Sequence, residues 1–415
     1  MLRLQMLPAA CGDCLWLEYG TPPATRLVLI DGGLRPTTAV LLRRLEQARR
    51  ERGVDVLEVE LLVVTHIDND HILGVIELLE NAPPWLKIKD IWFNGRRQLR
   101  RLPTPPPAPA RPRKPDGNRP GDLMGGGADD ADENGADPSA LASPADLLGP
   151  QQGDDLSKLL ETGRLPWNRH PDWNGEAIRI PADGPLPVVT LDGGLKLTLL
   201  GPTLERLYRL CTAWPSVLSG EDEPASPEAR PRDLLGRRDT WPPVWKDGET
   251  RDPSAANGSS IMLLAEYPSA TPPQGTYALL LAGDAHAPDM VAALERLRVE
   301  RSIPGPVPLT AFKLSHHGSD KNLSRELLER VECGRYLVST DGTVHSHPDH
   351  QALLRILRYS RSAPVLLFNC EVDTTKTWRD RKPDVLDSDS VGVALRDYTT
   401  RYPDDPADGI VLELD

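Results

Sequence analysis

Three apolar segments of this chain each end in a polar cluster that contains histidine, and in two of them also aspartate. Leu61–Val64 leads into Thr65–His71, Ala278–Ala282 into Gly283–His286, and Ala311–Leu314 into Ser315–Ser319. The apolar segments have the length and composition of buried strands. Because a sheet fixes the loops at the ends of its strands, we expect the clusters to meet at one sheet edge as a single site. The fold must therefore bring together strand ends that lie far apart in the sequence.

Strands alternate with helices over most of the chain. Two or three strands are predicted within 2–33, a helix over 37–53 and another over 72–79, separated by the strand 61–64. The same alternation returns over 287–369. Strand-rich halves with interleaved helices predict a mixed α/β sandwich.

The composition favours one domain, although 415 residues would allow two or three. With 42 Pro, 33 Gly and only 3 Phe, part of the chain cannot belong to a packed core. We expect a single domain over residues 1–415 with two insertions. These are a disordered Pro/Gly/Asp-rich segment at 102–151 and an irregular surface segment at 219–257. Residues 370–415 are expected to form a C-terminal extension packed on the core.

The formal charge of −13 argues against a protein that coats a polyanion with its whole surface. A local basic patch or a bound metal could still hold a phosphate chain. Five cysteines form no disulfide framework for so long a chain, so a reducing compartment, the cytoplasm, is expected. No signal peptide and no membrane span of about 20 apolar residues is recognisable, so no membrane interaction is expected.

The cluster after the strand 61–64 places four potential metal ligands within six residues, namely His66, Asp68, Asp70 and His71. In a turn between a strand and a helix, such a run can direct imidazoles and carboxylates at one point. Neutral histidine and ionised aspartate suit Zn²⁺ or Mn²⁺. The alternative interpretation is a solvated polar turn, but the similar clusters at two other strand ends favour a metal site.

The motifs together are specific. Asp31-Gly-Gly33, His66-x-Asp68-x-Asp70-His71, Gly283-Asp284 and Lys313-x-x-His316-His317-Gly-Ser319 form a series that resembles the metallo-β-lactamase superfamily. Within it, the chain is most similar to the metal-hydrolase domain of the ComEC-type competence proteins and to their stand-alone soluble relatives. The resemblance extends from the N-terminus to about Asn369, without the two insertions. It implies a metallo-β-lactamase fold, an αββα sandwich of the α/β class.

The resemblance also implies a first divalent ion, Zn²⁺ or Mn²⁺, and the residues that hold it. Asp70, His71 and one of His316 and His317 would be its ligands. Asp31 would orient the ligand loop from behind, a role that fixes the tautomer and the basicity of a ligand.

The resemblance implies ligands for a second ion as well. Asp284 would bridge to it, and His66 with Asp68 would face it. The sequence departs from the common pattern of the superfamily, because Asp68 stands where a histidine is usual and no histidine lies between the helix after His71 and Asp284. One or two ions are therefore expected, in a site rich enough in oxygen for Mn²⁺ to compete with Zn²⁺.

Metal chemistry makes hydrolysis the natural reaction, since a bound dication yields hydroxide at neutral pH. Asp68 could accept the water proton or act as a ligand. His347, before Pro348, could protonate a leaving oxygen or hold a phosphate, or it could simply be a polar residue at the start of a helix. Asp68 and His347 are the predicted catalytic residues.

Four further residues are candidates for substrate binding. Ser259 and Ser260 could donate hydrogen bonds to phosphate oxygens, although serine after Asn-Gly is commonly part of an ordinary turn. Arg96 and Arg97 could form a phosphate-binding rim, or the start of a solvated linker.

The scaffold itself does not decide the substrate. The ComEC-type resemblance implies a metal-dependent phosphodiesterase or nuclease that acts on DNA or another nucleic acid. One alternative is a hydrolase of a small ester, lactone or thioester, which would need an apolar pocket. Another is a regulatory binding protein on the same scaffold, which should have lost its ligands.

The 102–151 insertion suggests a means of control. It is suited to cleavage, so a protease or a regulatory partner could act on it. Its acidic part, Asp129–Asp137, could mimic phosphate and shield the site until the segment is cut.

Overall fold

The computed structural model describes residues 1–104, 149–215, 241–269, 275–344 and 346–414. The residues between these ranges include most of both predicted insertions and the acidic stretch Asp129–Asp137. The predictions of disorder and of shielding therefore lie outside the described residues.

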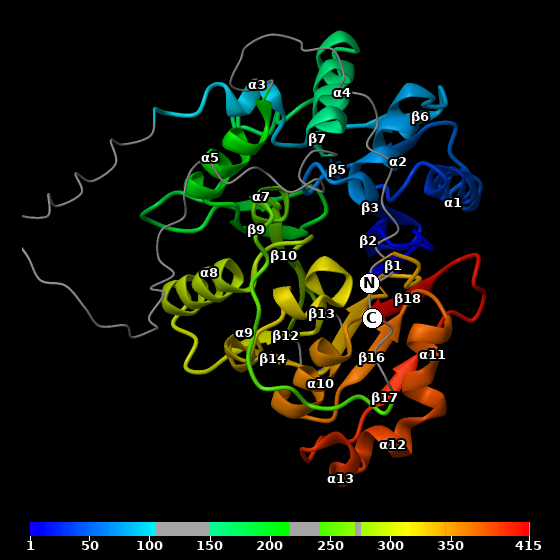
Figure 1. Ribbon diagram of the computed structural model, residues 1–415. Coiled ribbons are helices and arrows are strands. Elements are labelled where there is room, and N and C mark those ends of the chain that lie inside the picture. Colours follow the sequence, from blue (N-terminus) through cyan, green and yellow to red (C-terminus); the bar gives the residue numbers. More distant parts are fainter. Residues whose placement is uncertain (105–148, 216–240, 270–274, 345, 415) are drawn as a thin grey trace, which may run out of the picture.

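A six-stranded sheet forms the first layer of the fold (Figure 1), in the order β18-β1-β2-β3-β5-β7. Its strands are β1 (Leu2–Met6), β2 (Leu15–Thr21), β3 (Ala24–Ile30), β5 (Leu61–Val63), β7 (Ile91–Trp92) and β18 (Ile410–Leu414). The last strand pairs antiparallel with the first, Leu2 opposite Leu414, so both chain termini lie in this sheet. The C-terminal extension thus does more than pack on the core, because it completes a sheet.

An eight-stranded sheet forms the second layer, in the order β17-β16-β15-β13-β11-β10-β9-β8. Its strands are β8 (Val188–Thr190), β9 (Lys196–Gly201), β10 (Met262–Pro268), β11 (Thr276–Leu281), β13 (Ala311–Lys313), β15 (Arg335–Val338), β16 (Val365–Phe368) and β17 (Thr399–Arg401). From β11 to β17 all neighbours are parallel. Two small parallel sheets pair β4 (Leu57–Val59) with β6 (Leu86–Ile88), and β12 (Val307–Leu309) with β14 (Val331–Cys333).

The alternation of side chains along the strands builds the layers. On β2, Leu15 and Leu17 join the core cluster that the two sheets share, whereas Trp16 between them joins a second cluster. Successive strand residues point to opposite faces, so a strand such as β5, with Leu61 and Val63 in the first cluster and Leu62 in the second, is apolar on both faces. The predicted αββα sandwich is confirmed.

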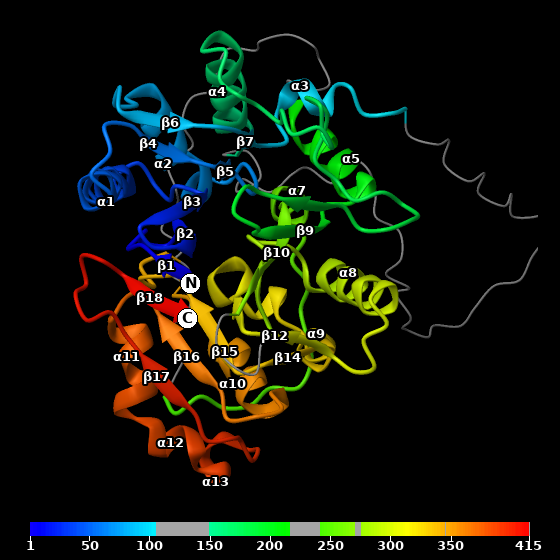
Figure 2. The same cartoon turned by 180° about the vertical axis from the view of Figure 1, so that it is seen from behind.

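Helices cover the outer faces of both sheets (Figures 1 and 2). Beside the first sheet lie α1 (Thr37–Glu51), α2 (Asn69–Glu80), α3 (Arg96–Leu99), α4 (Gly149–Thr162), α5 (Leu204–Ala213) and α7 (Ala255–Gly258). Beside the second lie α8 (Ala287–Glu300), α9 (Arg325–Arg330), α10 (His350–Tyr359), α11 (Asp373–Asp380), α12 (Lys382–Leu386) and α13 (Ser388–Val391). Two short 3₁₀ turns, η1 (Ser315–Gly318) and η2 (Asp320–Asn322), follow β13.

Helix α2 shows why the sequence folds in this way. Ile72, Val75, Ile76 and Leu79 recur at the spacing of one helix face, and all four are buried. In its first half the helix crosses the turn after β3 closely, since a Cβ on Gly74 would lie 1.9 Å from the carbonyl oxygen of Gly32. This contact holds the start of α2 against the end of β3.

None of the helices in the described ranges combines the length and the apolar character that crossing a membrane requires. All five cysteines are described, and all are free.

Candidate metal centre

The carboxyl ends of parallel strands from both sheets meet at one edge of the sandwich. Asp31 follows β3 and His66 follows β5, which pairs parallel with β3. Asp284 follows β11 and His317 follows β13, which pairs parallel with β11. The three strand-end clusters therefore meet in one place, as the sequence predicted.

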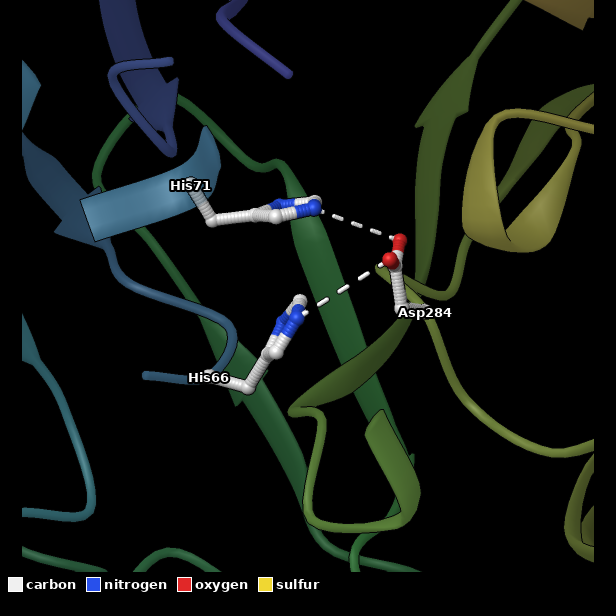
Figure 3. A group of neighbouring side chains, drawn as sticks. All are labelled: His66, His71 and Asp284. Carbon is white, nitrogen blue, oxygen red and sulfur yellow. Dashed lines mark ion pairs between the residues drawn. The ribbon is translucent and has the colours of Figure 1, made fainter. Parts of the chain in front are cut away.

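His66, His71 and Asp284 form the middle of this site. Figure 3 shows the two imidazole rings side by side, each turned toward the carboxylate of Asp284 from the opposite half of the sandwich. The Nε2 atom of His71 lies 3.4 Å from Oδ1 of Asp284, and that of His66 lies 3.9 Å from Oδ2. All three side chains are buried, and their candidate ligand atoms lie within 4.8 Å of one another.

Asp31 orients both of these histidines from behind. Its carboxylate accepts hydrogen bonds from the backbone N–H and the hydroxyl of Thr65, at 2.8 and 2.7 Å. Oδ2 also lies 2.9 Å from Nδ1 of His71. Because a carboxylate only accepts, Nδ1 of His71 carries a proton, and the lone pair of the neutral ring is on Nε2.

The same hydrogen-bond chain fixes His66. The hydroxyl of Thr65 uses its proton on Asp31, so it accepts from Nδ1 of His66 at 3.0 Å. The lone pair of His66 is then on Nε2, a buried atom without a hydrogen-bond partner among the described residues. Both rings present an unprotonated nitrogen to the same space.

His317 adds a third nitrogen. Its Nδ1 lies 2.9 Å from the carbonyl oxygen of Ser339, which can only accept, so its lone pair is also on Nε2. That Nε2 lies 3.3 Å from Nε2 of His71 and 3.2 Å from Oδ2 of Asp70. The geometry therefore groups His317, and not His316, with Asp70 and His71.

His316 points to a different partner, Asp252. Its Nδ1 lies 3.4 Å from Oδ2 of Asp252 and 3.0 Å from Oδ1 of Asn322, while its Nε2 lies 3.9 Å from Oδ2 of Asp284. Asp252 is almost fully buried and also accepts from the side chains of Asn257 and Asn322. Sequence reasoning missed Asp252, because it placed the residue in an irregular insertion.

The site attracts positive charge. Burial lowers the pKa of His71, but the carboxylates of Asp284, Asp70 and Asp31 outweigh it and raise that pKa well above its ordinary value. Burial also lowers the pKa of His317, but the carboxylates of Asp284 and Asp13 outweigh it and raise that pKa to about 9. Burial raises the pKa of Asp284, but the surrounding histidines outweigh it and hold that pKa well below the usual range.

The residues present fit a divalent metal ion. In the neutral state of the histidines, three imidazole lone pairs and the carboxylates of Asp70 and Asp284 face one another, which is the donor set that a divalent ion requires. The Nε2 atoms of His71 and His317, 3.3 Å apart, are held together by a shared proton or by a cation that replaces it. Asp70, His71, His317 and Asp284 could hold one ion, and His66, Asp68 and Asp284 a second, with His316 close by.

A fully buried ion pair supports the ligand loops from inside. Nζ of Lys313, at the end of β13, donates to Asp13, whose other oxygen lies 3.5 Å from Nδ1 of His317. A Cβ on Gly12 would lie 1.8 Å from the carbonyl oxygen of Asp70, so this loop packs directly under the start of α2. Lys313 belongs to one of the motifs in the sequence, but nothing there showed that it pairs with Asp13.

The two predicted catalytic residues lie at the rim. Asp68 is the N-cap of α2, yet its side chain makes no capping bond, and Oδ2 lies 3.6 Å from Nε2 of His66. The ring of His347 lies 5.5 Å from that of His316, and its Nδ1 lies 3.2 Å from Oδ1 of Asp349. Both residues adjoin the histidine cluster.

The four predicted substrate-binding residues are distributed differently. The hydroxyl of Ser259 donates to the carbonyl of Ala256 within a turn, and Ser260 accepts from the backbone N–H of Asp284. Both serines are buried; the hydroxyl of Ser260 supports the ligand loop at Asp284, whereas that of Ser259 closes its own turn. Arg96 lies 3.7 Å from a carboxylate oxygen of Asp154, and Arg97 is exposed.

The backbone of the site is strained. Asp31, His316 and His317 adopt φ values of 58°, 49° and 54°, in the left-handed region that non-glycine residues rarely occupy. Such conformations cost roughly 1 kcal/mol or more each and concentrate at functional sites. Their presence in three candidate residues supports a functional centre.

The fold and this centre together define a class of protein. A sequence profile described as the metallo-beta-lactamase superfamily matches residues 14–259, more than half of the chain. The chain therefore belongs to the metallo-β-lactamase superfamily, whose members are generally hydrolytic metalloenzymes. The match includes Asp31 and His66–His71 and ends before Asp284. A search of curated proteins finds no match to this chain.

Proposed function

We propose that this protein is a metal-dependent phosphodiesterase that hydrolyses nucleic acid. The observation that carries the hydrolase is the convergence of the Nε2 atoms of His66, His71 and His317 with the carboxylates of Asp70 and Asp284, in two overlapping groups of candidate ligands. The nucleic-acid substrate is supported by the resemblance of the strand-end motifs to ComEC-type hydrolase domains.

Asp70, His71, His317 and Asp284 would hold the first ion, and His66, Asp68 and Asp284 the second. Nitrogen and carboxylate ligands suit Zn²⁺, and the high share of carboxylates also suits Mn²⁺. When bound, the ion lowers the pKa of a water molecule and offsets negative charge on a phosphoryl oxygen.

The chain's own residues would position the substrate and move protons. Asp68 is available for this, since it is partly exposed and makes no capping bond to α2. It would accept a proton from the attacking water. Asp349 orients His347 through Nδ1, so the ring would hold the leaving oxygen or the phosphoryl group.

The cavity that adjoins Asp349, the partner of His347, has a volume of about 400 Å³ and a charged lining. Four acids outnumber two bases in it (Asp247, Glu249, Asp320 and Asp349 against Lys246 and Arg355), so the cavity disfavours an apolar substrate without favouring an anionic one. Small esters and lactones bind best in apolar pockets, and this lining is charged. The alternative of a purely regulatory protein predicts lost ligands, whereas the ligand set is nearly complete.

The test is add-back of metal to chelated protein. Hydrolysis of bis(p-nitrophenyl) phosphate and of linear single-stranded DNA should return with Mn²⁺ or Zn²⁺ and be lost in Asp70→Asn. Asp192→Asn, in the exposed turn between β8 and β9, is the matched control and should keep its activity. Equal cleavage by Asp70→Asn, or hydrolysis of lactones and thioesters alone, would refute the proposal.

A further inference from the structure

A second, basic cavity lies between α3 and the end of α4. It has a volume of about 500 Å³, and its lining includes Arg97, Arg164 and Arg169 together with one carboxylate, Glu161. In a chain with a formal charge of −13, a cavity with three arginines and one acid is unusual. It attracts anions.

The three guanidinium groups are available to a ligand. Within the described residues, no carboxylate lies within ion-pair distance of any of them. Neighbouring arginines are engaged, since Arg96 lies 3.7 Å from Asp154 and Arg101 lies 3.6 Å from Glu176. The arginines of the cavity therefore differ from their neighbours Arg96 and Arg101, which lie near carboxylates.

The backbone around the cavity is fixed before any ligand binds. The N–H of Arg169 donates to Asp90 at 2.9 Å, and the amide of Asn168 bonds both the N–H and the carbonyl of Phe93 at 3.0 Å. The amide of Gln98, on α3, donates to the carbonyl of Gly175. Because little backbone must be ordered on binding, the entropic cost of occupying the cavity is low.

The cavity and the metal centre share one edge of the first sheet. Strand β7 pairs parallel with β5, so α3 follows β7 at the edge where His66 follows β5. Helix α4 connects the two sites: a Cβ on Gly149, its first residue, would lie 3.0 Å from Oδ1 of Asp68, and Glu161 lines the cavity. Twelve residues of helix span about 18 Å.

We propose that this cavity binds a backbone phosphate of the nucleic-acid strand whose scissile bond lies at the metal centre. This inference rests on the proposed function. At about 3.4 Å of axis per phosphate in one strand of a duplex, 18 Å corresponds to roughly five phosphates. The cavity thus favours a chain substrate over a small phosphodiester, with α4 setting the distance between the two contacts.

The test measures binding of a 20-nucleotide phosphorothioate strand to the metal-loaded protein by fluorescence anisotropy over a range of salt concentrations. The variant is Arg164→Gln/Arg169→Gln. Its matched control is Arg361→Gln/Arg401→Gln, which removes the same charge from two exposed arginines elsewhere. Each phosphate contact contributes about 0.7 to the slope of log affinity against log salt for single strands.

The cavity variant should bind roughly tenfold more weakly at low salt, with a slope smaller by about 0.7, the value for one lost phosphate contact. The control variant should match the wild type, and oligonucleotides of three nucleotides should not distinguish the variants. Equal loss in both variants would show a general charge effect and overturn the proposal. If the wild type binds no nucleic acid but hydrolyses bis(p-nitrophenyl) phosphate, the nucleic-acid substrate itself is wrong. If it binds DNA but hydrolyses nothing, only the catalytic proposal fails.

Discussion

Replacing Asp31 by Asn should reverse the hydrogen-bond chain that directs two histidines into the metal centre. Asp31 accepts from Thr65 N–H, Thr65 hydroxyl and His71 Nδ1 at 2.7–2.9 Å and is almost fully buried. The asparagine oxygen can keep the bond from the backbone N–H of Thr65. Its NH₂ group would then face the Thr65 hydroxyl and Nδ1 of His71, where it must donate.

Both histidines would change tautomer as a result. Nδ1 of His71 would accept, so its proton would move to Nε2, which faces Asp284. The Thr65 hydroxyl would donate to Nδ1 of His66, with the same effect on that ring. A protonated Nε2 cannot bind a metal. The variant must therefore leave these newly favoured tautomers before it can bind the ion, and this costs free energy. Changes to residues behind metal ligands typically cost 10–100-fold in affinity, which is about 1.4–2.7 kcal/mol.

Isothermal titration of Zn²⁺ or Mn²⁺ into chelated Asp31→Asn and wild-type protein measures this loss. Asp90→Asn is the control, because Asp90 also accepts several hydrogen bonds, including two from the backbone of residues 169 and 170, but contacts no candidate ligand. It should lose stability without losing metal affinity. Wild-type affinity and stoichiometry in Asp31→Asn would refute the tautomer argument.

Four further outcomes are expected. His317→Ala should abolish binding of the first ion, whereas His316→Ala should retain it; the bound metal is measured by mass spectrometry after gel filtration, and equal losses would contradict the assignment. The pKa of His317, raised to about 9, means that metal displaces a proton, so apparent affinity should fall about tenfold per pH unit per proton below pH 9, with proton release in calorimetry. Gly12→Ala should weaken metal binding, because its Cβ would lie 1.8 Å from the carbonyl oxygen of Asp70; unchanged affinity would show that the loop can shift freely. Burial raises the pKa of Glu18, but hydrogen bonds from Thr25, Arg52 and Trp16 outweigh it and lower that pKa, so Glu18→Gln should destabilise the fold by about 1.5–3 kcal/mol at pH 7. Since a depressed pKa stabilises the fold only above the unfolded value, that difference should shrink as denaturant melts are taken below about pH 4.5, and a constant difference would contradict it.

Local patterns in the sequence predicted the elements that carry the site. The apolar run before His66 and the helical spacing after it needed only neighbouring residues, and both elements are present as β5 and α2. The apolar segment 311–314 is present as β13, but the sequence did not show that a separate short strand, β12, precedes it. Thr310 exchanges hydrogen bonds with Ala278 there, and the chain leaves the small sheet of β12 for the large sheet of β13.

Partners distant in sequence could not be predicted in this way. Lys313 and Asp13 pair across 300 residues, and neither position carries a local sign of the other. Asp252 and helix α4 lie at the borders of segments whose composition suggested insertions. For this reason the sequence did not predict the contact of Asp252 with His316, nor that α4 packs beside Asp68. Only the structure shows that Asp252 is buried. A buried carboxylate requires hydrogen-bond donors around it, and these identify its partners.

Anomalous diffraction from crystals grown with Zn²⁺ or Mn²⁺, recorded on both sides of the absorption edge of the metal, tests the central claim most directly. The account predicts an anomalous peak about 2.0–2.3 Å from Nε2 of His71, Nε2 of His317 and a carboxylate oxygen of Asp70 or Asp284. A protein that binds the metal in solution but shows its anomalous peak away from these side chains would contradict the account.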